Sequence, residues 1–444
     1  MTGPDVMPAR APDAAHDLPE PARRAIAAYR ERLAESGDDR PILVAWAPGR
    51  INLIGEHTDY NDGYVLPVAV DRVVALAGRP VTVGRRTTLY SVHHDRTASY
   101  NATRGALLDP RPRRLPQFAR YVRSVAVELA ALPGRRALEP AIEAAIAGDV
   151  PVGGGMSSSA AVTVAAATFA VALGGLVPTM EPLETARLCQ RAEQRAVGVR
   201  VGIMDQAASC LGQPASALLL DCRSLTYEHI PLRLDGVSLA VFDTGVPRTL
   251  ATVGYNERRG ECEAALALLA EAITADDPGR RVAALRDVTD ADLERYGARL
   301  PETLLRRARH VVRENARVLE AVRALRAGDA EALGALLDAS HASLRDDFAV
   351  SCAELEAAVA IARAVPGVLG ARLMGAGFGG AALVLVRTAA EDALDAALAS
   401  EYPQRTGRQG ALHRCRAAGG PRWVRVAAAE GAELALDSTR AHEV

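Results

Sequence analysis

An uncharged segment that directly follows a glycine loop constrains the fold of this chain more than any other feature. Ala160 to Val177 (AAVTVAAATFAVALGGLV) carries no charge and comes after three glycines and three serines. A membrane span is a poor interpretation, because the segment is rich in alanine, ends in a glycine pair and has no basic or aromatic anchors. A helix without a polar face is typical of a protein core. The pattern therefore predicts a buried helix whose first turn lies against a glycine loop.

The length of the chain predicts more than one lobe. The chain has 444 residues, whereas a single core stops growing at about 250–300 residues. A net charge of −2 argues against a general nucleic-acid binder. Helical and strand-like segments are mixed without regular alternation, so we expect an α+β fold. We expect a disordered N-terminal tail at 1–19, an N-terminal lobe at 20–225 and a C-terminal lobe at 226–444.

Periodicity and turn residues predict the individual elements. We expect helices at 20–35, 118–132, 182–196, 255–269 and 389–400, with consecutive helices through 280–365. We expect strands at 41–47, 64–70, 73–77, 141–146, 218–220, 237–242, 371–373, 381–386 and 421–428. The run His93–His94–Asp95 is expected to be a surface loop.

Two composition features limit the chemistry and the compartment. The chain contains no lysine, which excludes Schiff-base chemistry and the lysine-bearing P-loop as a phosphate site. The six cysteines have long, irregular spacings, which favour free thiols in a reducing compartment over a zinc site or a disulfide framework. The N-terminus lacks the apolar segment of a signal peptide. We expect a cytoplasmic protein, monomeric or weakly oligomeric, without nucleic-acid or membrane partners.

The glycine loop PVGGGMSSSAA, at residues 151–161, indicates an anion site. Consecutive glycines let the backbone approach a ligand closely, and the start of a helix offers free N–H groups and the positive end of the helix dipole. The serine hydroxyls could contact phosphate oxygens or a magnesium ion. The alternative is an ordinary serine-capped helix after a turn. A second glycine loop, MGAGFGGAALVLV at 374–386, indicates either a turn packed against a ligand site or a structural hairpin.

A third segment, APGRINLIGEHTDYNDGYVLPVAV at 47–70, concentrates polar groups beside apolar runs. Glu56, His57 and Asp59 could bind several hydroxyls of a polyol, because carboxylates accept hydrogen bonds and a histidine can donate or accept them. A solvated turn is the alternative. A calcium loop is disfavoured because the EF-hand spacing is absent, and a metal site on these three side chains is a minor alternative.

Asp205 lies in an apolar frame within VGVRVGIMDQAASCLG, at residues 197–212. A buried carboxylate is costly unless it has a partner, and Arg50 is the candidate partner. The alternative is a helix N-cap. Glu193 on the preceding predicted helix is a candidate second acid for holding a cation, with an exposed ion-pair partner on a charged helix as its alternative.

Taken together, these segments resemble the galactokinases of the GHMP small-molecule kinase superfamily. GRINLIGEHTDYNDGYVLP is similar to the signature that separates galactokinases from their relatives. GDVPVGGGMSSSAA and MGAGFGGAALVLV are similar to the ATP loop and the third motif of the superfamily. CQRAEQRAVGVRVGIMDQAAS, LLLDCRSL, YNERRGECE and SHASLRDDFAVSC also resemble galactokinase blocks. The matches cover residues 43–428.

The resemblance implies a two-lobed GHMP kinase fold with the active site in the cleft between the lobes, and ATP-dependent phosphorylation of galactose at its anomeric hydroxyl. It implies that Asp205 is the base, with Arg50 beside it and the γ-phosphate. The residues matching the sugar positions are Glu56, His57, Asp59, Gly202 and Tyr255. Those matching the ATP loop are Gly153, Gly154, Gly155, Met156, Ser157, Ser158 and Ser159. The residues matching the Mg²⁺ ligands are Ser158 or Ser159 with Glu193.

Two departures from the family pattern leave details open. The block Phe118–Ser124 lacks the usual Trp, Asn and Gly near the nucleotide base, and Asp243–Thr244 stands where many members have Asn-Ser. The alternatives are a GHMP kinase for another sugar, such as N-acetylgalactosamine or arabinose, and a non-catalytic sensor of galactose and ATP. The intact ATP loop and Asp205 disfavour the sensor.

Overall fold

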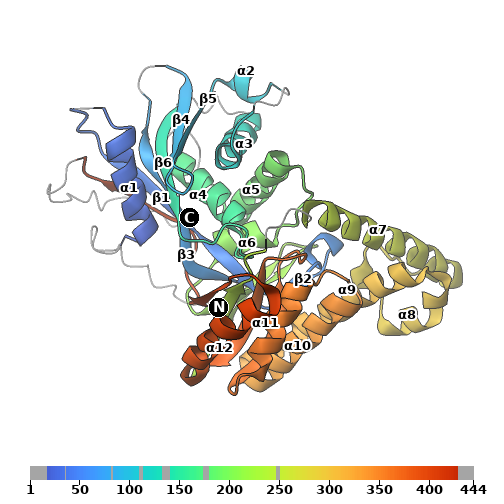
Figure 1. Cartoon of the computed structure of the whole chain (residues 1–444). Helices are drawn as coiled ribbons and strands as arrows, with labels where there is room; N and C mark the ends of the chain where they lie inside the picture. The colour runs from blue at the N-terminus through green and yellow to red at the C-terminus, as the bar shows by residue number, and fades with distance from the viewer. Residues whose placement is uncertain are drawn as a thin grey trace, which may run out of the picture.

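The computed structural model describes residues 18–35, 37–81, 84–109, 114–132, 141–173, 180–246 and 251–428. Helices and sheets are mixed, as expected for an α+β protein (Figure 1). The helices are α1 Glu20–Arg32, α2 Arg104–Leu107, α3 Gln117–Ala131, α4 Ser158–Ala172, α5 Pro182–Val197, α6 Met204–Leu211, α7 Ala251–Asp276, α8 Asp290–Tyr296, α9 Glu302–Ala327, α10 Ala330–Asp346, α11 Ala353–Ala364 and α12 Glu391–Thr406. The strands are β1 Ile42–Asn52, β2 Tyr64–Val65, β3 Pro67–Pro80, β4 Arg86–Ser91, β5 Arg96–Asn101, β6 Ile142–Gly148, β7 Ser216–Asp221, β8 Tyr227–Pro231, β9 Val237–Asp243, β10 Val368–Met374, β11 Ala381–Arg387, β12 Ala411–Cys415 and β13 Arg422–Val426.

A six-stranded sheet organises the first half of the chain, in the order β13-β1-β3-β6-β4-β5. Every residue of β1 is buried, because both faces of the sheet are covered. Ile42, Val44 and Trp46 pack into a cluster with α1, whereas Leu43 and Ala45 pack on the other face in the cluster that contains α4. This alternation explains why β1 reads as a continuous apolar run.

The helix that follows the glycine loop is buried, as the sequence predicts. Each residue from Ala160 to Ala167 in α4 is buried, and α4 packs on β1, β3, α3 and α5. In the part at 168–173 only Phe169 and Ala172 are buried, and the part at 174–177 lies outside the described residues. Within the described ranges, no helix has both the length and the hydropathy needed to cross a membrane.

A second sheet of four strands, in the order β10-β11-β9-β12, supports the second half of the chain. The helices α11 and α12 pack on one face of it, in a cluster with β9, β10 and β11. The helix α10 packs against β10 and contributes Leu333 and Leu337 to the main cluster on the opposite side. A separate cluster joins α7, α8 and α9, and these helices extend to one side in Figure 1.

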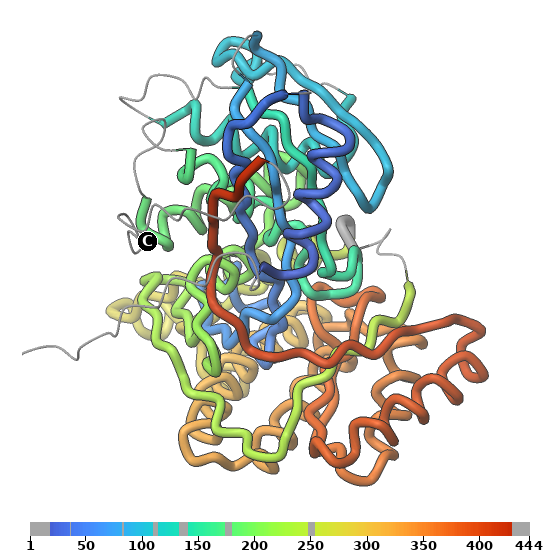
Figure 2. The backbone as a smooth tube through the Cα atoms, turned by 90° about the vertical axis from the view of Figure 1, so that its left-hand side faces the viewer, coloured from blue at the N-terminus to red at the C-terminus, as the bar shows by residue number. Residues whose placement is uncertain are grey.

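The two halves of the sequence are interleaved at the C-terminal end. The last strand, β13, pairs antiparallel with β1, with Ile42 opposite Val426 and Trp46 opposite Arg422. Figure 2 shows this segment, in red, rising from the lower part of the molecule to lie along β1. The division into lobes at residue 225 stays a prediction, and β13 belongs by its pairing to the sheet of the first half. The expected tail at 1–19 lies outside the described residues except for Leu18, which is buried, and Pro19.

Candidate active site

A cavity of about 1310 Å³ lies between the glycine loop and the segment after β1. Most of the residues proposed from the sequence line it. These are Arg50, Glu56, His57, Asp59, Gly153, Gly155, Ser157, Ser158, Ser159, Glu193, Gly202, Asp205 and Tyr255. Gly154 and Met156 do not line it. The side chain of Met156 is fully buried in the core, so only its backbone could serve a ligand in the loop.

The glycine loop turns sharply before α4. Gly153 and Gly155 both have φ of 82°, and Ser157, the residue before the helix, has φ of 56°. At Gly154 a Cβ atom would stand 2.6 Å from a carboxylate oxygen of Asp243 and 2.7 Å from Cβ of Pro151, so a larger residue there would force these neighbours to move. No side chain caps the helix at Ser157. The first N–H groups of α4 are therefore not used by a serine cap at Ser157, which disfavours the interpretation as an ordinary capped helix.

Arg50 and Asp205 form a bidentate ion pair at the wall of the cavity. Arg50 Nε donates to Asp205 Oδ1 at 2.7 Å, and Nη2 donates to Oδ2 at 2.6 Å. The partnership expected from the sequence is therefore present. Arg50 Nη1 also donates to the Gly155 carbonyl at 2.5 Å, and Ser157 Oγ donates to Asp205 Oδ2 at 2.5 Å. These contacts tie the carboxylate of α6 to the end of β1 and to the glycine loop.

Glu193 is buried, which excludes the alternative of an exposed ion-pair partner. Gln206 Nε2 donates to Glu193 Oε2 at 2.6 Å, and the hydroxyl of Ser159 also hydrogen-bonds the carboxylate. Burial raises the pKa of Glu193 to about 7, and the nearby charge of Asp205 adds to this rise. A buried carboxylate with neutral partners beside a glycine loop is an arrangement that a cation would stabilise.

Asp59 lies in the same cavity, and its position depends on Gly202. A Cβ atom at residue 202 would stand only 1.7 Å from Asp59 Oδ2, so no other residue can occupy that position without moving Asp59. Burial raises the pKa of Asp59 to about 7, and the charges of Asp205 and Glu56 raise it further. The side chain can therefore change its protonation state near neutral pH.

Aromatic rings enclose His57 beside Asp59. The rings of Phe348 and Tyr255 lie 4.6 Å and 5.7 Å from that of His57, measured between centroids. The Tyr60 hydroxyl is 2.8 Å from His57 Nδ1. Burial, with the nearby charge of His310, lowers the pKa of His57 to about 3. His57 is therefore neutral at physiological pH and can offer one donor and one acceptor.

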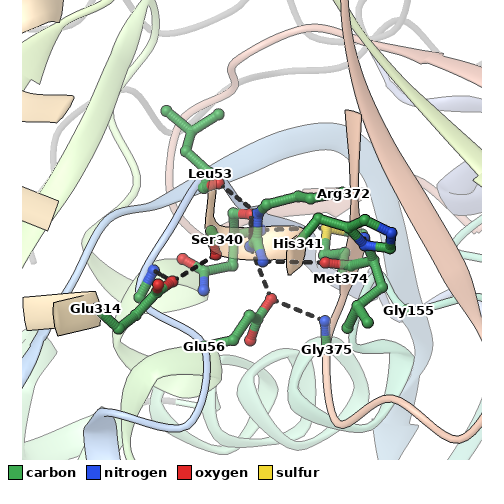
Figure 3. A network of polar contacts seen from close by, with 12 residues as sticks. Leu53, Glu56, Gly155, Glu314, Ser340, His341, Arg372, Met374 and Gly375 are labelled. Atoms are coloured by element: carbon green, nitrogen blue, oxygen red, sulfur yellow. Dashed lines mark hydrogen bonds and ion pairs between the residues drawn. The ribbon is translucent and has the colours of Figure 1, made fainter. Parts of the chain in front are cut away.

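The backbone of residues 52–59, here called the sugar loop, is fixed by residues far along the chain. Gly55 N donates to Glu314 Oε1 at 3.0 Å, and His310 Nε2 lies 3.1 Å from the Glu56 carbonyl. Glu314 is fully buried and also accepts from the Ser340 hydroxyl at 2.7 Å. Figure 3 shows Glu314 and Ser340 beside Arg372 and Glu56. Helices α9 and α10 of the second half therefore hold a loop of the first half.

Several cavity residues were not identified from the sequence. The turn His93–Asp95 is exposed, as expected, but His93 and His94 also line the cavity, and the His94 ring stacks on Phe118 at a centroid distance of 5.8 Å. Apolar side chains from β6 and α4 line the same region, and no local motif indicates them. In the second glycine loop Gly375 and Ala376 reach the cavity. The loop is therefore more than a structural hairpin.

Comparison with known proteins agrees with this geometry. Residues 27–80 match the galactokinase galactose-binding signature, residues 120–213 the GHMP kinase N-terminal domain and residues 321–404 the GHMP kinase C-terminal domain. A galactokinase of Roseiflexus sp. (strain RS-1) is 42% identical over 88% of this chain and 95% of its own length. A galactokinase of Thermotoga maritima is 39% identical over 81% of this chain and 94% of its own length.

Solved structures share the fold over nearly the whole chain. The galactokinase of Lactococcus lactis complexed with galactose superposes with a TM-score of 0.79 at 32% identity, covering 89% of this chain and 99% of its own. The mevalonate kinase of Methanococcus jannaschii reaches a TM-score of 0.62 at 16% identity, covering 87% of this chain and all of its own, and this likeness concerns the fold alone. With a galactokinase-specific signature at the sugar loop and curated galactokinases aligned along most of its length, the chain belongs to the galactokinase family of the GHMP kinases.

Proposed function

We propose that this chain transfers the γ-phosphoryl group of ATP to the anomeric hydroxyl of α-D-galactose, giving galactose 1-phosphate and ADP. One observation carries the proposal. Polar side chains of the sugar loop, the glycine loop and the Arg50–Asp205 pair all line a single cavity. Phosphoryl transfer requires positioning and charge stabilisation rather than covalent chemistry, and this cavity offers both.

In this proposal Asp205 accepts the proton of the anomeric hydroxyl. The sugar O–H bond breaks, the sugar oxygen bonds to the γ-phosphorus, and the bond from that phosphorus to the bridging oxygen of ADP breaks. The guanidinium of Arg50 holds the carboxylate of Asp205 in place before the reaction through two hydrogen bonds. Because Arg50 also contacts the carbonyl of Gly155 in the glycine loop, it is placed to attract the negative charge of the transferring group.

The sugar ring is held by the side chains that resemble the family's sugar positions. Glu56 and Asp59 offer oxygen acceptors for hydroxyl groups, and neutral His57 offers one donor or acceptor. Because Gly202 has no side chain, it leaves space for the carboxylate of Asp59. Tyr255, which lies in α7, lines the same cavity. Buried polar groups of this kind reject a sugar that leaves them unpaired.

The glycine loop and the start of α4 bind the triphosphate of ATP in this proposal. The loop supplies backbone N–H groups and the positive end of a buried helix. The chain has no lysine, so backbone N–H groups and Arg50 bind the phosphates in this proposal. Ser157 and Ser158 place hydroxyls at the same wall of the cavity.

A magnesium ion fits the oxygen donors near Glu193. Mg²⁺ prefers hard oxygen ligands and retains water, so a protein needs to supply only one or two of them. Ser158 or Ser159 and Glu193 would hold it, and the buried carboxylate with its raised pKa is suited to a cation. When bound, the ion would neutralise phosphate charge. Within the described ranges no cluster of three His, Cys, Asp or Glu side chains offers a site built by the protein alone.

A sugar panel tests this proposal directly. Purified protein is incubated with ATP, Mg²⁺ and galactose, N-acetylgalactosamine, arabinose or glucose, and the sugar 1-phosphate is measured by ³¹P NMR. We expect galactose 1-phosphate as the main product. A faster reaction with N-acetylgalactosamine or arabinose would replace the proposal by the other-sugar alternative, and binding of galactose and ATP without turnover would support the sensor.

The six cysteines are free, which supports the proposal of a cytoplasmic location.

A further inference from the structure

The side chain of Arg372 crosses from the second half of the chain to the sugar loop. It lies in β10 and is fully buried. Its Nε donates to the Leu53 carbonyl at 2.7 Å, and its Nη2 donates to the Asn52 carbonyl at 2.7 Å. The same Nη2 donates to Glu56 Oε1 at 2.9 Å. Figure 3 shows the bonds to Leu53 and Glu56 meeting at the guanidinium. One side chain therefore fixes both the backbone and the carboxylate of the sugar loop.

The carboxylate of Glu56 is held at one oxygen only. Oε1 accepts from Arg372 and also from Gly375 N at 2.8 Å, the first glycine of the second glycine loop. Among the residues that the structure describes, no group hydrogen-bonds to Oε2, and Glu56 lines the cavity. Two donors on one oxygen set the rotation of the carboxylate and leave the other oxygen for a ligand.

Stability alone is a poor reason for this arrangement. A fully buried ion pair repays its desolvation only partly, and replacing both partners by apolar side chains is often neutral or stabilising. Three of the carboxylates that line the cavity, those of Glu56, Asp59 and Asp205, also lie close enough to influence one another. Asp205 is paired with Arg50 and Glu56 with Arg372, whereas the pKa of Asp59 is raised by burial and by the other two acids. The two arginines thus compensate two of the three charges.

We propose that Arg372 is a positioning residue for sugar binding, which acts by aiming Glu56 Oε2 at a hydroxyl of the sugar. The inference rests on the proposed function, because it names how one sugar contact is prepared. A binding group whose rotation is set before the ligand arrives loses less entropy on binding. The second glycine loop takes part through Gly375 N, so this motif serves the sugar side of the cavity as well.

Calorimetry of galactose and of ATP, measured separately, tests the inference with four variants. Arg372→Lys keeps a charge but cannot reach Glu56 and both carbonyls together, and we expect its galactose Kd to rise at least about tenfold while its Kd for ATP changes less than twofold. Glu56→Gln should weaken galactose to a similar degree. If Arg372 acts through Glu56, the double variant binds galactose no more than about threefold more weakly than the worse single variant.

The control is Arg79→Lys, because Arg79 is also a buried arginine paired with a carboxylate, Asp38, but does not line the cavity. It should change the galactose Kd less than twofold. An Arg372→Lys variant with unchanged galactose affinity, or a double variant whose losses multiply, would overturn the inference. Absence of galactose binding by the unmodified chain would instead refute the proposed function.

Thermal melts establish whether Arg372→Lys folds. If it shows no cooperative transition, Glu56→Gln decides the question, since it leaves Arg372 in place. Arg372 and Gly375 N would then hold the amide oxygen at the Oε1 position and turn the amide NH₂ toward the cavity. We expect at least about tenfold weaker galactose binding at an unchanged ATP Kd. Galactose binding equal to that of the unmodified chain would overturn the inference.

Discussion

Asp205 is the residue on which the proposed chemistry depends most. In Asp205→Asn the side chain keeps its shape but can no longer take a proton. General-base assistance contributes roughly 10²–10⁴-fold to a rate, so kcat should fall by that factor, whereas the galactose Kd should change only a few fold. Steady-state kinetics and calorimetry measure the two quantities. A kcat within threefold of the unmodified value would remove Asp205 as the base.

A matched control separates chemistry from the loss of an ion pair. Asp292 also forms a bidentate pair with an arginine, Arg280, at 2.7 Å for both contacts, but it does not line the cavity. Asp292→Asn removes a comparable interaction at a distance from the reaction. It should lower the melting temperature without lowering kcat.

The raised pKa of Asp59 predicts a pH dependence of sugar binding. With a pKa of about 7, the carboxyl is mostly neutral at pH 6 and ionised at pH 8. Sugar hydroxyls donate best to the ionised form, so galactose should bind on the order of tenfold more weakly at pH 6 than at pH 8, and the affinity should level off above pH 7. Calorimetry without nucleotide across this range provides the measurement.

Other groups in the cavity decide how that pH profile is assigned. His57 has a pKa of about 3 and does not titrate in this range. Glu193 has a pKa of about 7, so it requires a control. Asp59→Asn should flatten the profile, whereas Glu193→Gln should retain it. A profile that persists in Asp59→Asn would assign the titration to another group.

Glu193→Gln also tests the magnesium proposal. The change preserves size and one acceptor oxygen but removes the negative charge that would hold the cation. The Mg²⁺ concentration for half-maximal rate should rise several fold, with little change in the galactose affinity measured without nucleotide. The variant Gln206→Glu offers a comparison with Glu193→Gln, because Gln206 is the hydrogen-bond partner of Glu193 and the change would add a negative charge beside Glu193. An Mg²⁺ titration of Glu193→Gln that superimposes on that of the unmodified chain would exclude Glu193 as a ligand.

At the scale of elements, the connection from α5 to α6 packs closely against the sugar loop, where Gly202 lies against Asp59. In Gly202→Ala the new methyl group would overlap Asp59 Oδ2, so the carboxylate has to move. Misplacement of a binding group by about 1 Å can cost on the order of 10²-fold, and kcat/KM for galactose should fall by up to that amount. Gly260→Ala is the control, because Gly260 lies in α7 with nothing within 4 Å of an added Cβ. It should leave kcat/KM unchanged, and unchanged kinetics in Gly202→Ala would contradict the fit.

Most elements with a strong local pattern could be predicted from the sequence. The helices α1, α3 and α5 begin and end within three residues of the expected bounds. The break expected between the strands at 64–70 and 73–77 was wrong, because β3 runs unbroken from Pro67 to Pro80. Asp71 indicates a break by its residue type, but its backbone bonds to Arg416 far along the chain. Local propensity cannot include such a partner.

The short strands β8 and β12 were missed for a related reason. Ala411–Cys415 is short and mixes apolar with polar residues, and it is a strand because β9 offers an edge to which it can pair. Likewise, the sequence predicts a strand at 421–428, but its pairing with β1 nearly 380 residues earlier depends on the whole fold. Cavity-lining residues that belong to motifs could be predicted from the sequence, whereas Arg372 and Glu314 carry no local signal that connects them to Glu56 and Gly55.

At the scale of the whole molecule, a sugar that binds a loop held by both halves of the chain should stabilise the folded state. Galactose at 100 times its Kd contributes about 2.7 kcal/mol. An unfolding entropy near 2.1 cal/mol/K per residue gives roughly 0.9 kcal/mol/K for the chain, so the melting temperature should rise by about 3 °C. Differential scanning fluorimetry with and without the sugar measures this rise.

Glucose provides the sharpest comparison, because it differs from galactose only in the direction of the C4 hydroxyl. The wrong epimer would leave half-buried acceptors such as Asp59 unpaired, and a site of this kind can discriminate by on the order of 10⁴. Glucose at the same concentration should therefore leave the melting temperature unchanged. In Asp59→Asn the rise with galactose should shrink, since the sugar hydroxyls lose a charged acceptor. The melting temperature without sugar should stay the same or increase, because a partly desolvated charge is removed. Equal stabilisation by the two sugars in the unmodified chain would show that the cavity does not distinguish the two orientations of the C4 hydroxyl. It would favour the alternative of a kinase for another sugar.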